Sequence, residues 1–332
     1  MTILYDAPGP KARRRNLVLS LVALVATVAG GYLFIYRPLA SQGQFAADLW
    51  APLIDPSHEY FNQVWQRLGT GFRATLTAAA GAIVASLLVG TALAILRVQL
   101  RSLANRRFVT APPAVAILLR GLVLVGRWTV RTVVEICRGI PVVITIFFVW
   151  VALPSFGLKF ETSLWYLVIG LTIYNGVVIA EVLRSGMEGL PGGQREAADA
   201  IGLTPFQSTR MILLPQAFRI MLPALISQLV VILKDTSLGF IIIYEEVLRV
   251  GGQLQQFLEN PIQVYAVIGV IYILVNYTLS RLAQFTQNRL AKGRRTADIA
   301  TAMHLPTTIE SMEATDVDHP ARHPLATDHQ RP

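Results

Sequence analysis

Residues Glu196–Pro215 read EAADAIGLTPFQSTRMILLP, and this stretch decides how the rest of the chain is interpreted. The pattern favours a short helix over Gln194–Ile201, with Glu196 in the first turn, where the helix dipole stabilises an anion. Its alanines keep that helix slim, and Gly202 can end it as a C-terminal cap. Thr204-Pro205 forms a good N-cap and N1 pair for a second short helix. From the residues alone, the stretch is either a docking element for a partner or only a well-capped loop.

The composition around this loop is that of a membrane protein. The chain has 332 residues, of which 53% are hydrophobic and 15% are charged, and its mean hydropathy is +0.51. A soluble domain carries about 25% charged residues. Segments near the 20 or so apolar residues that cross a bilayer occur six times, at Leu17–Tyr36, Ala74–Leu96, Thr132–Leu153, Leu164–Leu183, Ala217–Ile243 and Val264–Leu282. The prediction is therefore an all-α polytopic membrane protein with about six transmembrane helices.

Two apolar segments need separate interpretation. Leu17–Tyr36 follows a basic start, as in a signal peptide, but it is longer than a signal core of about 7–15 residues and lacks a small-residue cleavage site. We interpret it as a retained helix. Ala114–Gly126 is short and interrupted by Arg120, so it is predicted to be an interfacial helix on the cytoplasmic side.

Lys and Arg set the expected orientation. The formal net charge is +9, which in a soluble protein would suggest nucleic acid as a partner; in a membrane protein it reflects basic residues retained at the cytoplasmic ends of helices. They concentrate at Arg13–Arg15, between residues 97 and 131, between 184 and 210, and between 289 and 295. We therefore expect a plasma-membrane protein with both termini in the cytoplasm.

Motifs for chemistry on a substrate are missing from the sequence. It contains no phosphate-binding Gly-x-x-x-x-Gly-Lys-Ser/Thr loop, no His-Glu-x-x-His and no Gly-x-Ser-x-Gly. The single cysteine, Cys137, is interpreted as a small packed residue. Residues 291–332 are predicted to be a disordered cytoplasmic tail, and the spacing of its histidines (His304, His319, His323 and His329) fits no compact metal site. The chain is thus expected to be no enzyme and to bind no cofactor or metal.

The loop resembles the EAA loop of permease subunits of ABC importers. The matching positions are Glu196, Ala197, Ala198, Gly202, Ile212, Leu214 and Pro215. The resemblance implies a type I ABC importer transmembrane domain, in which this loop docks on an ATPase dimer that binds ATP and Mg²⁺. It further implies a second copy or a sister permease, an extracellular solute-binding protein, and the lipid bilayer as partners.

Three further segments resemble the polar amino-acid branch of that family. They are Glu135-Ile-Cys-Arg138-Gly-Ile-Pro141, Ala180-Glu181-Val-Leu-Arg184-Ser-Gly186, and Lys234-Asp235-Thr-Ser-Leu238. The resemblance is closest to glutamate-type permeases of actinobacteria, which implies glutamate or a related acidic or amide amino acid as cargo. It assigns residues 69–290 to the permease domain, with the coupling loop at 184–215, and residues 1–68 to an N-terminal segment with the first helix and an extracellular linker.

Charged residues in these segments are candidates for the gate or the translocation path. Lys234 and Asp235 are neighbours that point to different sides of a helix, so each needs its own partner, either substrate or another subunit. The pairs Glu135–Arg138 and Glu181–Arg184 have i,i+3 spacing and are predicted to form ion pairs, with either a structural or a gating role. Pro141 is expected to be tolerated in its helix or to bend it.

Two alternatives stay open at this point. A secondary transporter or channel acting without an ATPase would need inverted repeats or ion-binding carboxylates near mid-membrane, and neither is evident. The segment Tyr244–Asn260 is predicted to be a short extracellular helix, which either contacts a binding protein or only connects two spans.

Overall fold

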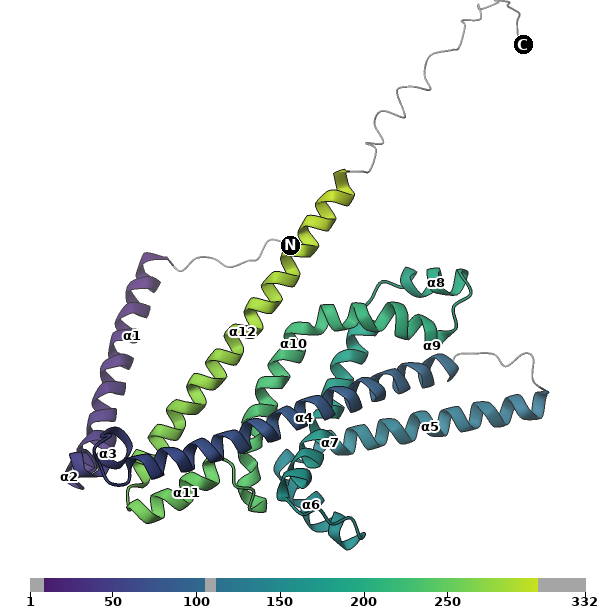
Figure 1. Ribbon diagram of the computed structural model, residues 1–332. Helices are drawn as coiled ribbons and strands as arrows, with labels where there is room; N and C mark the ends of the chain where they lie inside the picture. The colour runs from purple at the N-terminus through teal and green to yellow at the C-terminus, as the bar shows by residue number, and fades with distance from the viewer. Residues whose placement is uncertain (1–8, 105–111, 304–332) are drawn as a thin grey trace, which may run out of the picture. The chain divides into compact units, whose positions relative to one another are not determined.

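The computed structural model describes residues 9–104 and 112–303, and every regular element in those ranges is helical (Figure 1). The predicted all-α fold is confirmed for this part of the chain. Met1–Ser280 and Arg281–Pro332 are two separate units and are described separately. The longer helices are α1 (Pro10–Gly31), α4 (Phe61–Ala104), α5 (Pro113–Gly139), α6 (Val142–Ser155), α7 (Ser163–Glu188), α10 (Leu214–Asp235), α11 (Val247–Leu258) and α12 (Pro261–Met303). Short elements are η1 (Tyr32–Tyr36), α2 (Arg37–Ser41), α3 (Ala47–Ile54), α8 (Gly193–Ala200), α9 (Pro205–Ser208), η2 (Thr209–Leu213) and η3 (Thr236–Ile242).

The main core lies between α4 and α7, which pack along much of their length. Small residues make this close approach possible. A Cβ atom added to Gly90 of α4 would lie 2.7 Å from Cγ2 of Ile179 and 2.8 Å from the carbonyl oxygen of Gly176, both in α7. Small residues bring helix backbones together in membranes, where tight packing replaces the hydrophobic effect as the driving force.

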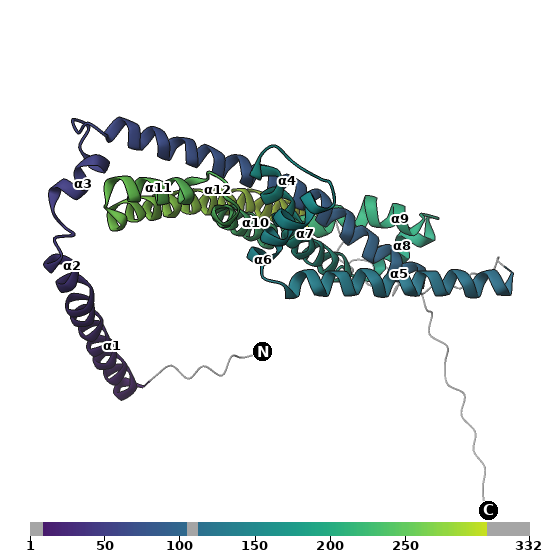
Figure 2. The ribbon, with the colours of Figure 1, turned by 90° about the horizontal axis from the view of Figure 1, so that it is seen from below.

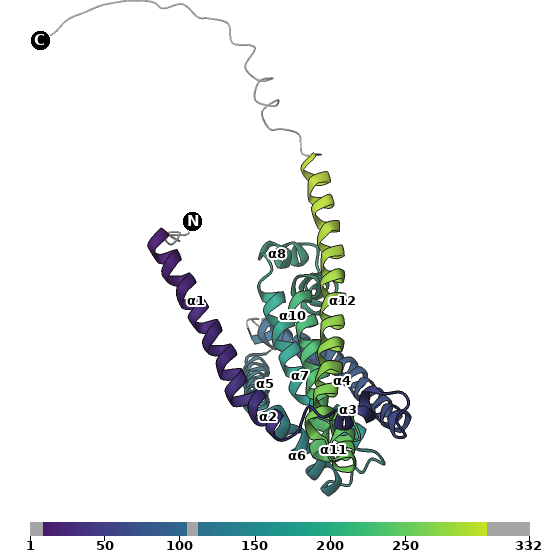
Figure 3. The same ribbon diagram turned by 90° about the vertical axis from the view of Figure 1, so that its left-hand side faces the viewer.

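Helix α10 covers another side of α7 (Figure 3). The two helices are joined inside the core by a polar contact, in which Nε2 of Gln228 donates to Oδ1 of Asn175 over 2.6 Å. Asn175 is completely buried. Because an amide without a partner is costly in an apolar interior, this hydrogen bond fixes the register of α10 on α7.

A second, smaller core lies at the opposite end of the unit from α8 and α9 (Figure 2). Its buried residues are Leu53, Val64, Leu68, Val247, Val250, Leu254, Val264 and Ile268. Asn260 donates from its Nδ2 to the carbonyl oxygen of Leu49 over 2.8 Å, and Gln263 donates to that of Gln44 over 2.7 Å. The predicted short helix within Tyr244–Asn260 is confirmed as α11.

The segment from Pro113 to Ser155 differs from the expectation. The interfacial helix at Ala114–Gly126 and the first part of the span predicted at Thr132–Leu153 form one helix, α5, of 27 residues. The break falls instead at Ile140, whose backbone is extended (φ −90°, ψ 131°). Pro141 disfavours a helical conformation in the residue before it, and the chain restarts as α6 after Pro141. The predicted bend at Pro141 is thus a complete interruption.

Six helical segments in the described ranges are long and apolar enough to cross a membrane. They are Pro10–Ser41, Phe61–Ala104, Pro113–Gly139, Ser163–Glu188, Pro205–Ile242 and Pro261–Arg281. The number of candidates equals the predicted number, but by length and composition the third candidate is α5 and not a helix over Thr132–Leu153. The predicted fifth span includes the end of α10 at Asp235 and the 3₁₀ segment η3. Helix α12 runs to Met303, beyond the predicted start of the tail at residue 291, while the four tail histidines lie outside the described residues.

Candidate functional site

The loop of the opening stretch begins with α8, which has the predicted bounds to within one residue at each end. Gly202 ends it in a left-handed conformation with φ 77°. There the N–H of Gly202 donates to the carbonyl oxygen of Asp199 and that of Leu203 to Ala198, both over 3.0 Å. The predicted glycine cap is confirmed, and the turn reverses the chain toward α9.

The second short helix, α9, begins at a capping box. The N–H of Gln207 donates to Oγ1 of Thr204 over 3.3 Å, and the N–H of Thr204 donates to Oε1 of Gln207 over 2.8 Å. The predicted Thr204-Pro205 start is therefore confirmed, with Gln207 as a partner that had not been identified. The chain continues through η2 into α10, whose first two residues are Leu214 and Pro215.

The seven loop positions separate into an outward and an inward group. Glu196, Ala197, Gly202 and Pro215 are exposed, whereas Ala198 is buried and Ile212 and Leu214 are half-buried. The inward residues therefore attach the loop to its own chain. The exposed face also carries three apolar side chains that sequence reasoning missed: Ile201 (74% exposed), Met211 (65%) and Phe206 (50%). The loop is apolar at many positions, some of them buried or half-buried, such as Leu213 and Ile212, so no sequence signal distinguishes the three exposed residues.

Gln99 of α4 connects the loop to the helix core. Its Nε2 donates to Oγ1 of Thr209 over 2.8 Å and to the carbonyl oxygen of Pro205 over 3.2 Å. The loop thus rests on α4 as well as on the two helices, α7 and α10, that it joins. Because Gln99 and Thr209 are far apart in the sequence, no local pattern could have predicted this contact.

A cluster of charged side chains lies where α4 and α7 approach the loop. Glu181 binds Arg97 of α4 and also accepts from Arg184 over 2.8 Å. Arg184 binds Glu188 over 2.6 Å, and Glu188 binds Arg101 of α4 over 2.6 Å. The predicted Glu181–Arg184 pair is confirmed, but it is part of a larger network that clamps the two helices together.

Arg97, Arg101 and Glu188 were not identified from the sequence. Glu181, Arg184 and Glu188 have i, i+3 and i+7 spacing, and Arg97 and Arg101 have i,i+4 spacing, so each set lies on one helix face. Facing stripes of opposite charge on two helices were the signal that could have identified the network.

The predicted pair Glu135–Arg138 is wrong. Both side chains are exposed, and within residues 9–104 and 112–303 no ion pair joins them. An exposed i,i+3 pair gains too little to hold two long side chains in place. Both residues instead line a cavity of about 340 Å³, together with the charged network of α4 and α7.

Lys234 and Asp235 lie at the other end of α10 from the loop. Lys234 is exposed and Asp235 is half-buried, and neither has an ion-pair partner among the described residues. The structure therefore brings Glu135, Arg138, Glu181 and Arg184 together at one end of the helices and keeps Lys234 and Asp235 apart from them. The expectation that each of the latter needs its own partner is not met within the described chain.

Comparisons with known proteins agree on one class. Residues 114–292 match the sequence profile of the family described as "Binding-protein-dependent transport system inner membrane component". The chain is similar to the glutamate transport system permease protein GluD of Corynebacterium glutamicum, with 36% identity over 265 residues, or 79% of this chain and 86% of that protein. It is also similar to the probable glutamine ABC transporter permease protein GlnP of Bacillus subtilis, with 34% identity over 47% of this chain and 72% of that protein.

Solved structures share the fold. An amino acid ABC transporter crystallised with histidines matches with a TM-score of 0.55 and 22% identity, covering 69% of this chain and 96% of that one. The inward-facing methionine transporter MetNI matches with a TM-score of 0.53 and 20% identity, covering 68% of this chain and 96% of that one.

Proposed function

Because this chain belongs to the family of binding-protein-dependent inner membrane transport components, as a permease subunit of an amino-acid importer of the ABC type, we propose that Glu196–Pro215 receives the motion of a partner ATPase. The chain is a transport component, and ATP hydrolysis in this family belongs to a separate chain. ATP and Mg²⁺ are accordingly assigned to that partner. Membership of this family also favours the ATP-driven mechanism over a secondary transporter or channel acting alone.

The observation that carries the proposal is the outward face of α8 and the short turn after it. Glu196, Ala197 and Ile201 are exposed there, while Ala198 is buried on the chain's own side. A small helix with one free face and rigid attachments can transmit a displacement. Gln99 of α4 is bonded to Pro205 and Thr209, in the segment that follows α8, and the charged network joins α4 to α7. A displacement of the loop would therefore reach both helices of the core.

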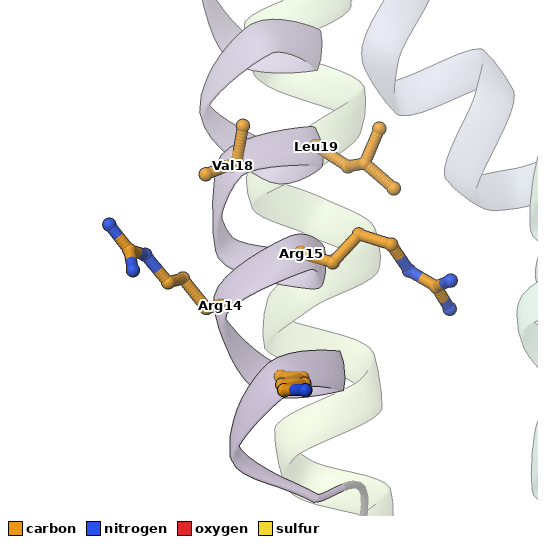
Figure 4. Close-up of a pocket in the computed structure, with 5 residues that line it drawn as sticks. Arg14, Arg15, Val18 and Leu19 are labelled. Carbon is orange, nitrogen blue, oxygen red and sulfur yellow. The ribbon is translucent and has the colours of Figure 1, made fainter.

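The proposed orientation puts this loop and both termini in the cytoplasm of a multi-pass membrane protein. Its support is the distribution of basic residues. Figure 4 shows Arg14 and Arg15 projecting from opposite sides of the first turns of α1, with the apolar Val18 and Leu19 following. Basic side chains at one end of an apolar helix hold that end on the cytoplasmic side.

Helix α5 is proposed to lie at the cytoplasmic surface although it is long enough to span. Arg120, Arg127, Arg131 and Arg138 occur along it, and each arginine in mid-membrane would cost about 2.5–3.5 kcal/mol. Figure 1 shows α5 beside the C-terminal half of α4, the half from which Gln99 reaches the loop. The crossing back to the outside then begins at Pro141 with α6.

The proposed assembly contains two permease chains, identical or sister, with two ATPases and an extracellular solute-binding protein. Lys234 and Asp235 support the second permease, because a charge in a membrane helix needs a partner and none of the described residues pairs with either. Glu196, Ala197, Ala198, Gly202, Ile212, Leu214 and Pro215 are assigned to coupling. Residues 69–290 are assigned to the permease domain.

The proposed cargo is glutamate or a related acidic or amide amino acid. The support is the printed names of the similar proteins, which are a glutamate permease and a probable glutamine permease. No side chain is assigned to cargo binding. Glu135, Arg138, Glu181 and Arg184 are assigned to a cytoplasmic gate, because they lie around one cavity where α5, α4 and α7 meet.

The test replaces Glu196 with arginine in the assembled transporter. We expect the Glu196→Arg permease to reach the membrane but to lose co-purification with the ATPase and ATP-driven uptake. Glu161→Arg is the matched control, because Glu161 is also exposed and lies in the connection between α6 and α7. If the Glu196→Arg transporter retained both ATPase association and uptake, the coupling assignment would be wrong.

A further inference from the structure

The arginines of α5 form a continuous stripe. Arg120, Arg127, Arg131 and Arg138 are separated by seven, four and seven residues. At 3.6 residues per turn these intervals are close to whole turns, so all of the side chains leave the helix in nearly one direction. Leu118, Leu122, Val125, Val133 and Ile136 follow the opposite side of the helix, and all are exposed. Helix α5 is thus amphipathic, with a cationic edge and an uncovered apolar face.

Three arginines of this stripe line the cavity of about 340 Å³. They are Arg127, Arg131 and Arg138, and the other walls come from Arg97, Leu100 and Arg101 of α4 and from Glu181, Arg184 and Glu188 of α7. Cavities of about 300–1,000 Å³ are typical of sites for small ligands or head groups. The cavity is therefore large enough to admit a charged group of that size.

The balance of charge in this cavity leaves the α5 side positive. Glu181 and Glu188 are already bound by Arg97, Arg101 and Arg184. Arg127, Arg131 and Arg138 have no carboxylate within ion-pair distance in the described ranges, and Glu135 is the only acid of α5 that lines the cavity. Guanidinium groups clustered in this way select phosphate, because their fork of N–H donors matches its oxygens.

The neighbourhood indicates which phosphate the site takes. Trp128 is 62% exposed, and the guanidinium of Arg131 lies over its ring at 5.4 Å from the centroid. Tryptophan rings gather at the boundary between head groups and acyl chains, and arginine side chains extend to the same level. An apolar face on the same helix would enter the acyl chains while the arginines stay at head-group level.

We propose that Arg127, Arg131 and Arg138 bind the phosphate group of an anionic phospholipid of the cytoplasmic leaflet, whose acyl chains cover the apolar face of α5. This inference uses the orientation proposed above but not the coupling to an ATPase. The bound lipid would join α5 to the α4–α7 charged network directly beside the coupling loop. The transporter would thereby depend on the anionic lipid content of its membrane.

The test measures lipid contact at Trp128 in the full permease chain, reconstituted without ATPase in nanodiscs. Brominated phosphatidylglycerol or brominated phosphatidylcholine quenches nearby tryptophans. The chain has 5 tryptophans. The quenching of Trp128 is therefore obtained by subtracting the quenching measured for the same protein with Trp128→Phe. We expect Trp128 to prefer phosphatidylglycerol over phosphatidylcholine by about fivefold or more, since each arginine near such a surface contributes roughly that factor.

The variant Arg127→Gln/Arg131→Gln/Arg138→Gln should lower this preference nearly to one. Its matched control is Arg37→Gln/Arg67→Gln/Arg73→Gln, which removes the same charge from exposed arginines outside α5 and should leave the preference unchanged. Circular dichroism and gel filtration check that both variants fold.

Three results would overturn the proposal. Equal quenching by the two lipids would show that the site has no preference for anionic lipid. Abolition of the preference by millimolar inorganic phosphate would assign the site to a soluble phosphate. Unchanged preference in the α5 variant, with ATPase association lost, would make the stripe a protein-docking surface. Because the lipid measurement needs no ATPase, it can fail while the coupling assignment stands, and the reverse also holds.

Discussion

Arg97 of α4 forms an ion pair with Glu181 of α7. One turn further along α4, Arg101 binds Glu188 of α7. The Arg97–Glu181 pair is mostly shielded from solvent, with side-chain exposures of 15% and 17%. Arg184 binds Glu181 from the neighbouring turn of α7. Glu181 thus holds two arginines from two helices and joins the ends of α4 and α7 that lie near the loop.

The first prediction concerns this shared carboxylate. Glu181→Gln should lower the free energy of unfolding by about 2 kcal/mol, because hydrogen bonds to charged groups contribute about 1.5–3 kcal/mol and two arginines lose their anion. The measurement is unfolding of the purified permease in mixed micelles. Glu161→Gln, in the exposed α6–α7 connection, is the control and should be neutral. Equal stability of the two variants would mean that the network contributes nothing to the fold.

The second prediction concerns the contact between α4 and α7. Gly90→Ala would drive a methyl group against Ile179 and the carbonyl oxygen of Gly176, at 2.7 and 2.8 Å. We expect a loss of about 1–3 kcal/mol in the free energy of unfolding, as for other overpacked cores. Gly121→Ala in α5 is the matched control, because nothing lies within 4 Å of its added Cβ. It should be neutral or stabilising by about 0.5–1 kcal/mol. A similar response of both variants would contradict the close packing at Gly90.

Local signals account for what the sequence predicted correctly. Gly202, Thr204 and Pro205 act through their own backbone conformation or hydrogen bonds to near neighbours, so the bounds of α8 and the start of α9 could be predicted without knowing the fold. The Glu181–Arg184 pair likewise lies within one helix. These features need only the 3.6-residue period and the rules for helix ends.

Contacts between distant segments could not be predicted in this way. Gln99 reaches the loop because α4 is a helix of 44 residues that extends beyond the predicted span at Ala74–Leu96. Hydropathy marks only the apolar part of such a helix, and its polar ends are the parts that carry Arg97, Gln99 and Arg101. The joining of two predicted segments into α5 has a related cause: Arg120 interrupts the hydropathy of a helix but not the helix itself.

The third prediction concerns pH and Glu246, which begins α11 at the end of the unit away from the loop. Its carboxylate accepts from the N–H groups of Leu248 and Arg249 over 2.8 and 2.7 Å. Glu246 is completely buried, and burial raises its pKa from 4.5 to about 7 in spite of these bonds. The folded protein therefore holds a proton that the unfolded chain releases above pH 4.5.

The direction in which stability changes with pH follows from this difference in pKa. The stability associated with the protonated carboxyl is fully present below pH 4.5 and is lost as the pH rises through about 7. At about 1.4 kcal/mol per pKa unit, the whole change is about 3 kcal/mol. Glu246→Gln should remove this part of the pH dependence and raise the unfolding midpoint at pH 8 relative to the unmodified protein. Glu245 is the exposed neighbour of Glu246, so Glu245→Gln is the control and should keep the pH dependence of stability. Parallel pH profiles for all three proteins would show that Glu246 titrates at its ordinary value.

The fourth prediction concerns Ile201, the apolar side chain at the end of α8 in the proposed coupling loop. It is 74% exposed and lies directly before the left-handed Gly202. Burial of such a side chain in a partner is worth about 1.5–3 kcal/mol, which corresponds to an affinity change of about 10- to 100-fold. Ile201→Ser should therefore weaken binding of the ATPase at least about tenfold while leaving the unfolding midpoint unchanged.

The matched control for Ile201 is Ile243→Ser. Ile243 is 58% exposed and lies between η3 and α11, at the opposite end of the unit from α8. The Ile243→Ser variant loses the same side chain as Ile201→Ser, but it should bind the ATPase with unchanged affinity. Titration of the ATPase against permease in nanodiscs measures both. Unchanged affinity in Ile201→Ser would restrict the docking face to Glu196 and Ala197, whereas equal weakening in both variants would indicate a general loss of folding. Because Ile201 faces away from the chain's own core, only a partner can explain a selective loss of binding.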